Sequence, residues 1–149
     1  MSLLVDVFRP SSRVFVDTAP IIYFIEAHAV YGPLVKQFVS LFSRDHISAC
    51  TSVITLAEVL VAPYAANDAV LIEKFSAFLI HGRSMSLLEV SARMAQESSR
   101  LRSRYQFLKA FDALQLATAA VSGVQYFLTN DKKLRQVDEL EIVILDDHV

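Results

Sequence analysis

The sequence is poor in cysteine and glycine and has no tryptophan, with one Cys, three Gly and four Pro among 149 residues. The single cysteine, Cys50, cannot form an internal disulfide, which excludes a small scaffold held together by disulfides. It lies in the apolar run HISAC and is best explained as a small buried residue. No Pro/Gly/Ser-rich linker, repeat or low-complexity tract divides the chain, so we expect one domain over residues 1–149.

Long apolar runs and a strong excess of charge are missing as well. No apolar run approaches the ~18 to 20 residues of a membrane span, and the first residues, MSLLVDVFRP, do not resemble a signal peptide. A formal charge of −2 gives no overall attraction to polyanions, so contact with nucleic acid would require a local basic patch. We therefore expect a cytoplasmic protein without membrane contact, whose 54% hydrophobic residues form a core.

Short β-rich segments alternate with segments of helical periodicity. Strands are predicted at residues 14–16, 46–50, 84–88, 126–129 and 141–145. Helices are predicted at residues 19–26, 33–42, 52–61, 68–80, 91–105 and 111–122. Nearly continuous apolar strands joined by helical crossovers favour a parallel sheet that is buried on both faces. The predicted fold class is α/β, a three-layer α/β/α sandwich with a parallel central sheet.

Four acidic residues lie where such a sheet would gather its functional groups. Ligands bind beyond the carboxyl ends of parallel strands, and Asp17 and Asp131 follow two predicted strands, in VFVDTAP and FLTND. Glu58 lies two helical turns after another strand, in TSVITLAEVL, and Asp112 lies near the start of the apolar helix in KAFDALQLATAA. We expect the four carboxylates to converge from distant parts of the sequence.

Each acid also has a simpler explanation. Asp17 and Asp131 are placed as helix N-caps, and Glu58 could face solvent. Asp112 is harder to explain in this way, because an unpaired carboxylate in a mostly buried helix is costly. Four carboxylates in one cleft repel each other unless their pKa values rise or a divalent cation neutralises them. Oxygen ligands without Cys or His indicate Mg²⁺ or Mn²⁺ rather than Zn²⁺.

The succession VFVDTAPIIYFIE, TSVITLAEVL, FDALQLATAA and YFLTNDKKL resembles the PIN-domain family, in particular the small VapC ribonucleases of toxin–antitoxin pairs. The resemblance covers nearly the whole chain. It implies an endoribonuclease dependent on Mg²⁺ or Mn²⁺ that cuts RNA, with a cognate antitoxin as partner. Many relatives carry a proline before the third acid, where this chain reads LKAFDAL.

The resemblance also implies roles for individual residues. It makes a catalytic, metal-binding quartet of Asp17, Glu58, Asp112 and Asp131. We assign Asp17 and Asp112 as central ligands, while Glu58 and Asp131 complete the metal's shell and orient the attacking water. The residues that would hold these carboxylates or touch phosphate are Thr18, Ser52, Thr129 and Asn130.

Contacts with partners have weaker signals. Four basic residues precede the third acid in SSRLRSRYQFLKAFD and are candidates for RNA binding, although they would also complement a helix dipole: Arg100, Arg102, Arg104 and Lys109. Of the four histidines only His28 falls near a proposed catalytic segment, and a surface position explains it. The apolar stretch IIYFIEAHAVYGPL, with Tyr23, Phe24 and Tyr31, predicts a homodimer or a docked partner helix.

Other classes of function fit less well. A receiver-like module needs paired acids after its first strand and a Lys after its last, whereas the chain has a lone Asp17 and ends in LDDHV. A phosphatase of the Asp-x-Asp-x-Thr type fails because DTAPI lacks the second Asp. A catalytically silent PIN-like module that binds RNA or protein is the better alternative, because a sequence shows ligands and not turnover.

Overall fold

A computed structural model describes residues 3–44 and 46–149 of the chain. Its centre is a parallel sheet with strand order β3-β2-β1-β4-β5. The strands are β1 (Arg13–Val16), β2 (Ser48–Ser52), β3 (Met85–Leu88), β4 (Tyr126–Thr129) and β5 (Glu141–Ile144). The helices are α1 (Thr18–Ile25), α2 (Tyr31–Ser43), α3 (Val53–Val59), α4 (Val61–Ala65), α5 (Ala69–Leu79), α6 (Ala92–Arg104) and α7 (Ala110–Val121). Short 3₁₀ turns are η1 (Leu4–Asp6), η2 (Lys132–Gln136) and η3 (Leu145–His148).

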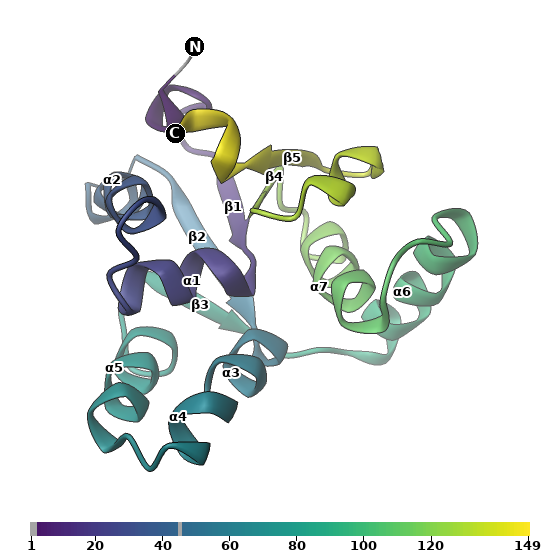
Figure 1. Cartoon of the computed structure of the whole chain (residues 1–149). Helices are drawn as coiled ribbons and strands as arrows, with labels where there is room; N and C mark the ends of the chain where they lie inside the picture. The colour runs from purple at the N-terminus through teal and green to yellow at the C-terminus, as the bar shows by residue number, and fades with distance from the viewer. Residues whose placement is uncertain (1–2, 45) are drawn as a thin grey trace.

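Helices cover the sheet on both faces, as the sandwich prediction required. In Figure 1, α1, α2 and α5 lie on one side of the sheet, and α6 and α7 lie on the other. Successive residues of a strand point to opposite faces, so Val14 and Val16 join the core under α1 and α2 while Phe15 joins the core under α7. Phe15 stacks on Phe127 of β4, with ring centroids 5.2 Å apart. The predicted α/β/α class is therefore confirmed.

Helix α7 is the most deeply buried helix on the face of the sheet to which Phe15 points. Ala113, Leu116, Ala117 and Ala119 are all fully buried between the sheet and α6. Small alanine side chains allow such close packing on both sides of one helix. The helix ends at Val121, and Gly123, just beyond its cap residue Ser122, has a φ of 73°, a conformation that favours glycine. This packing fixes the direction of α7 and so fixes the position of its first turn.

The order of the strands defines where a ligand would bind. The chain adds β2 and β3 on one side of β1 and then crosses to β4 and β5 on the other side. In open α/β sheets this reversal leaves a crevice at the carboxyl ends of the central strands. The backbone N–H of Asp17 donates to the carbonyl oxygen of Leu128 at 2.9 Å, so β1 and β4 remain paired up to this edge.

Two of the departures from the predicted boundaries have clear physical reasons. The predicted strand at 46–50 runs from Ser48 to Ser52, because its first residue is set by hydrogen bonding to Ser12 on the neighbouring segment. The predicted helix at 52–61 is divided into α3 and α4 at Leu60. Pro63 lacks the N–H that would bond to residue 59, which interrupts the series of helical hydrogen bonds.

No helix within the described ranges is long and apolar enough to cross a membrane.

Candidate active site

The four acids come from four separate segments of the fold. Asp17 follows β1 and caps α1, and Asp131 follows β4 and caps η2. Glu58 lies on α3, and Asp112 lies in the first turn of α7. A pocket of about 600 Å³ is lined by Glu58, Lys109, Ala110, Phe111, Asp112 and Asp131. Three of the four acids therefore share one pocket.

Asp17 is held in place by two hydrogen bonds. Its Oδ1 accepts the backbone N–H of Thr18 at 2.9 Å, and its Oδ2 accepts the hydroxyl of Thr129 at 2.8 Å. Burial raises the pKa of Asp17 from 3.8 to about 6, against these hydrogen bonds and with help from the charges of Asp112 and Glu58. Asp17 keeps some solvent exposure as a residue, but enough protein surrounds its carboxylate to disfavour ionisation.

Asp112 is the second acid whose pKa is raised. Burial raises the pKa of Asp112, the charge of Asp131 raises it further, and Lys109 opposes both effects. Asp131 also behaves as the cap that the sequence suggested, since its Oδ1 accepts the backbone N–H of Lys133 at 3.0 Å. Its own N–H donates to the hydroxyl of Thr129 at 3.1 Å. Capping and lining the pocket are thus compatible roles for one carboxylate.

Glu58 belongs to a chain of hydroxyl groups that starts at the end of β1. The Thr18 hydroxyl donates to Oε1 of Glu58 at 3.1 Å and lies 3.4 Å from the hydroxyl of Thr55. The Thr51 hydroxyl lies 2.8 Å from Thr55 and donates to the carbonyl oxygen of Val16 at 2.7 Å. These contacts fix α1 and α3 relative to each other beside the pocket.

Gln115 joins this network from the opposite layer. It is 1% exposed, its Nε2 donates to the Thr55 hydroxyl at 2.6 Å, and its Oε1 accepts the hydroxyl of Ser52. Ser52 in turn caps α3 by accepting the N–H of Ile54. Gln115 and Thr55 were not among the predicted site residues. A Gln three residues after Asp112 on an otherwise apolar helix is the signal that could have found Gln115.

Asn130 connects the site to the far side of β4. Its Oδ1 accepts the backbone N–H of Asp146 at 3.0 Å, and its Nδ2 donates to the Tyr23 hydroxyl at 3.4 Å. The amide therefore ties the end of β4 to η3 and α1.

His28 lies at the surface, where its Nδ1 accepts the backbone N–H groups of Val30 and Tyr31.

The donor set suits a hard divalent cation, although the side chains are not yet gathered around one point. The described residues contain no group of three or more His, Cys, Asp or Glu side chains arranged to hold a metal ion. Glu58, Asp112 and Asp131 line the pocket instead, and Asp17 lies near them. They offer oxygen ligands only, which Mg²⁺ and Mn²⁺ prefer. A bound cation would offset both the burial and the repulsion between acids that together raise the pKa of Asp17 and Asp112.

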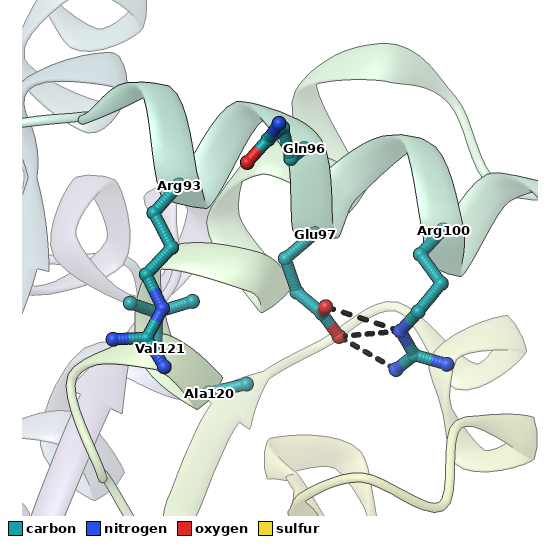
Figure 2. Close-up of a pocket in the computed structure, with 6 residues that line it drawn as sticks. All are labelled: Arg93, Gln96, Glu97, Arg100, Ala120 and Val121. Atoms are coloured by element: carbon teal, nitrogen blue, oxygen red, sulfur yellow. Dashed lines mark hydrogen bonds and ion pairs between the residues drawn. The ribbon is translucent and has the colours of Figure 1, made fainter.

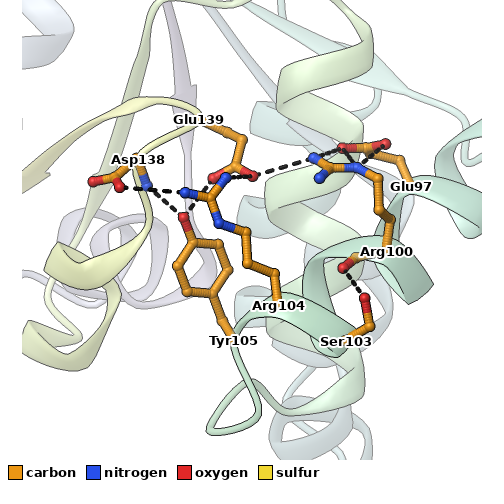
Figure 3. Close-up of polar contacts among 7 residues, drawn as sticks. All are labelled: Glu97, Arg100, Ser103, Arg104, Tyr105, Asp138 and Glu139. Carbon is orange, nitrogen blue, oxygen red and sulfur yellow. Dashed lines mark hydrogen bonds and ion pairs between the residues drawn. The ribbon is translucent and has the colours of Figure 1, made fainter.

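Two of the predicted RNA-binding arginines are engaged by acids. Figure 3 shows Arg100 between Glu97 and Glu139, at 2.6 and 3.1 Å, and Arg104 beside the same Glu139 at 3.3 Å. The hydroxyl of Tyr105 donates to Glu139 at 2.8 Å. This network attaches the end of α6 to the segment before β5.

Arg100 also lines a second pocket, of about 390 Å³, between α6 and the end of α7. Figure 2 shows this pocket with Arg100 bonded to Glu97, and its remaining lining residues are Arg93, Gln96, Ala120 and Val121. None of the four acids lines it. Lys109, by contrast, lines the pocket with the acids, and it forms no ion pair with any described residue. Arg102 is exposed on α6.

A family model for the PIN domain matches residues 14–140, a range that contains all four acids. This chain belongs to the PIN-domain family. The match confirms the resemblance seen in the motifs. The acids of this chain lie at the carboxyl edge of the sheet, within the range that the family model matches.

Solved structures show the same PIN fold. VapBC2 from Rickettsia felis, bound to a DNA fragment from its promoter, has a TM-score of 0.70 and 17% identity, covering 89% of this chain and 98% of that chain. A toxin–antitoxin complex from Klebsiella pneumoniae has a TM-score of 0.69 and 22% identity, with coverages of 89% and 97%. Mycobacterium tuberculosis VapC20, a sarcin-ricin loop cleaving toxin, has a TM-score of 0.66 and 17% identity, with coverages of 86% and 98%. No curated protein matches the PIN chain in sequence.

Proposed function

We propose that this protein is a metal-dependent endoribonuclease of the VapC type that hydrolyses RNA phosphodiester bonds. The observation that carries the proposal is the convergence of carboxylates from four segments: Glu58, Asp112 and Asp131 line one pocket, Asp17 lies close enough to feel the charges of Asp112 and Glu58, and the pKa values of Asp17 and Asp112 are raised. Glu139, a carboxylate outside this site, is paired with Arg100 and Arg104. Within the described residues none of these four acids forms an ion pair.

Each acid has a role in this proposal. Asp17 and Asp112 are the central ligands for Mg²⁺ or Mn²⁺, and Glu58 and Asp131 complete the set. When bound, the cation supplies positive charge against the phosphate oxygens and lowers the pKa of a water molecule. Glu58 and Asp131 orient that water for attack on phosphorus. The hydrogen bonds from Thr18 and Thr129 hold Asp17 in one orientation throughout.

Lys109 supplies the substrate contact that the acids cannot. An RNA backbone is an anion and would be repelled by an acidic pocket, so a free ammonium group at the rim favours its approach. Arg102 is the other exposed candidate, while Arg100 and Arg104 would have to leave their acidic partners to bind phosphate. We therefore rank Lys109 first among the four basic residues for RNA binding.

The test is cleavage of a fluorescent single-stranded RNA with Mn²⁺ or Mg²⁺ and then with EDTA. Asp131→Asn should lower the metal-dependent rate by ~10²-fold or more, the scale for removing one electrostatic group, while the melting temperature stays nearly constant. Asn caps about as well as Asp, so Asp68→Asn, which changes the cap of α5, is the matched control and should leave cleavage intact.

Two results would contradict the proposal. If Asp131→Asn cleaves as fast as the parent in an EDTA-sensitive reaction, Asp131 acts only as the cap of η2. If the parent shows no metal-dependent cleavage of any RNA, the protein is a catalytically silent module that binds RNA or protein.

A cognate antitoxin and a homodimer complete the proposal, with the chain acting as one domain over residues 1–149 in the cytoplasm. The neighbouring toxin–antitoxin structures support the antitoxin. Tyr23 packs on Tyr31 and Phe24 packs on Phe78, with centroids 4.8 and 5.3 Å apart, so these rings stabilise the protein internally. Each of these rings also stays partly exposed, so the predicted dimer would use the surface around Tyr23, Phe24 and Tyr31. Size-exclusion chromatography with light scattering, with and without a candidate antitoxin, would measure both assemblies.

A further inference from the structure

An exposed aromatic ring stands at the mouth of the acidic pocket. Phe111 is 57% exposed, lies in the first turn of α7 and lines the pocket beside Asp112. It belongs to neither of the two hydrophobic cores, whereas Leu108 and Ala113 on either side of it are buried in the second core. The backbone around Phe111 is therefore anchored while its ring remains available to a ligand.

The groups around the ring restrict what that ligand can be. Besides Phe111 and Ala110, the lining consists of charged residues: Glu58, Lys109, Asp112 and Asp131. An apolar helix of a partner protein would have to remove these charges from water without pairing them, which is costly. A ligand that offers a flat π-face next to an anionic group matches the ring and the ammonium at once. Single-stranded nucleic acid has this alternation of base and phosphate.

We propose that Phe111 is a stacking platform for one base of a single-stranded RNA, with Lys109 contacting the phosphate beside that base. The proposal rests on the ribonuclease function proposed above and names its substrate contact. Neighbouring residues on a helix project about 100° apart, so the ring and the carboxylate of Asp112 line adjacent walls of the pocket. A base held on Phe111 places the adjoining phosphodiester over the acids. The pocket, at about 600 Å³, is in the ~300–1,000 Å³ range of ligand sites.

The decisive readout is binding without catalysis. A short single-stranded RNA with one 2-aminopurine base is titrated with protein in EDTA, so that the RNA is not cleaved during the measurement. The variants compared all keep the same four carboxylates. Stacking on the ring should quench the fluorescence of the base. Phe111→Leu should weaken binding about 5- to 150-fold, the range expected for one stacked base, and should abolish the quenching, whereas Phe111→Trp should retain both.

Two controls separate stacking from general effects. Tyr64→Leu removes another exposed aromatic ring, 62% exposed on α4 and absent from the pocket lining, and should leave RNA binding unchanged. An oligonucleotide with an abasic site in place of 2-aminopurine should bind parent and Phe111→Leu equally. Because Phe111 lies outside both cores, its variants should keep the parent's melting temperature.

The outcomes distinguish this inference from the proposed function. If the parent cleaves RNA and Phe111→Leu binds and quenches like the parent, the stacking role is refuted while the nuclease stands. The same holds if Phe111→Leu loses only the binding of an antitoxin, since the ring would then be a protein contact. If the parent neither binds nor cleaves RNA, the function itself fails.

Discussion

Replacing Asp17 by Asn should make the metal-free protein more stable at neutral pH. The pKa of Asp17 is raised from 3.8 to about 6, chiefly by burial. The folded protein therefore holds this proton more tightly than the unfolded chain does. The stabilisation that results is fully present below pH 3.8 and is lost as the pH rises through about 6. Above that pH the ionised carboxylate lowers the free energy of unfolding, and Asn avoids this loss because it has no charge.

The size of the effect follows from the pKa difference. A rise from 3.8 to about 6 corresponds to about 3 kcal/mol. Partial exposure of Asp17 reduces this through solvent screening. Asn also offers one acceptor oxygen where Asp17 offers two, so the hydrogen bond from Thr18 or from Thr129 is weakened. We expect a net gain of about 1–2 kcal/mol at pH 7 after these deductions.

Urea unfolding in EDTA, followed by circular dichroism between about pH 4 and pH 7, measures this difference. The gap between Asp17→Asn and the parent should be small or reversed at the acidic end and should open in favour of the variant toward neutrality. Adding Mn²⁺ should stabilise only the parent and reverse the order. A variant that is less stable than the parent at pH 7, or a gap that does not change with pH, would refute the reasoning.

Three further substitutions test other parts of the structure. Gln115→Leu removes the amide that donates to the buried Thr55 hydroxyl and accepts that of the buried Ser52, and should lower the free energy of unfolding by about 1–3 kcal/mol in urea titrations. Burial opposes ionisation of Glu139, but hydrogen bonds from Tyr105 and Arg100 outweigh it and lower its pKa. Glu139→Gln should thus destabilise the protein by about 1 kcal/mol at pH 7, and the loss should shrink as the pH falls below 4.5. Asp112→Asn should keep the metal-free melting temperature and lose the rise that Mn²⁺ gives the parent; an intact rise would exclude Asp112 as a ligand.

The strands were predictable because burial on both faces requires a nearly continuous run of apolar residues. The positions of the acids followed from the ends of those strands. All four residues of YFLT in β4 are buried, so they form an unbroken run of large side chains and Thr. Parallel strands end at one edge, so residues that directly follow them could be placed together without knowledge of the packing. That is why Asp17 and Asp131 could be assigned to the same region from sequence.

Other features of the structure depend on contacts between residues far apart in the chain, and the hydrophobic periodicity of the sequence does not reveal such contacts. Gln115 meets Thr55 because α7 packs across β2, sixty positions away along the chain. Arg104 looked like a free cation in SSRLRSRYQFLKAFD, since its partner Glu139 lies thirty-five residues later. The division between α3 and α4 depends on a single missing N–H at Pro63, which an apolar pattern does not register.

The pairing of β1 with β4 has a consequence for how the protein is made. The part of the chain before α7 carries Asp17 and Glu58, and the part from α7 onward carries Asp112 and Asp131. Ribosomes synthesise the first pair long before the second, and the sheet joins the two parts when β4 hydrogen-bonds to β1. A growing chain thus holds an incomplete acid set, and the proposed nuclease would act only when its own translation is nearly complete. Nuclease activity measured on nascent chains would then begin late in synthesis, when β4 docks on β1.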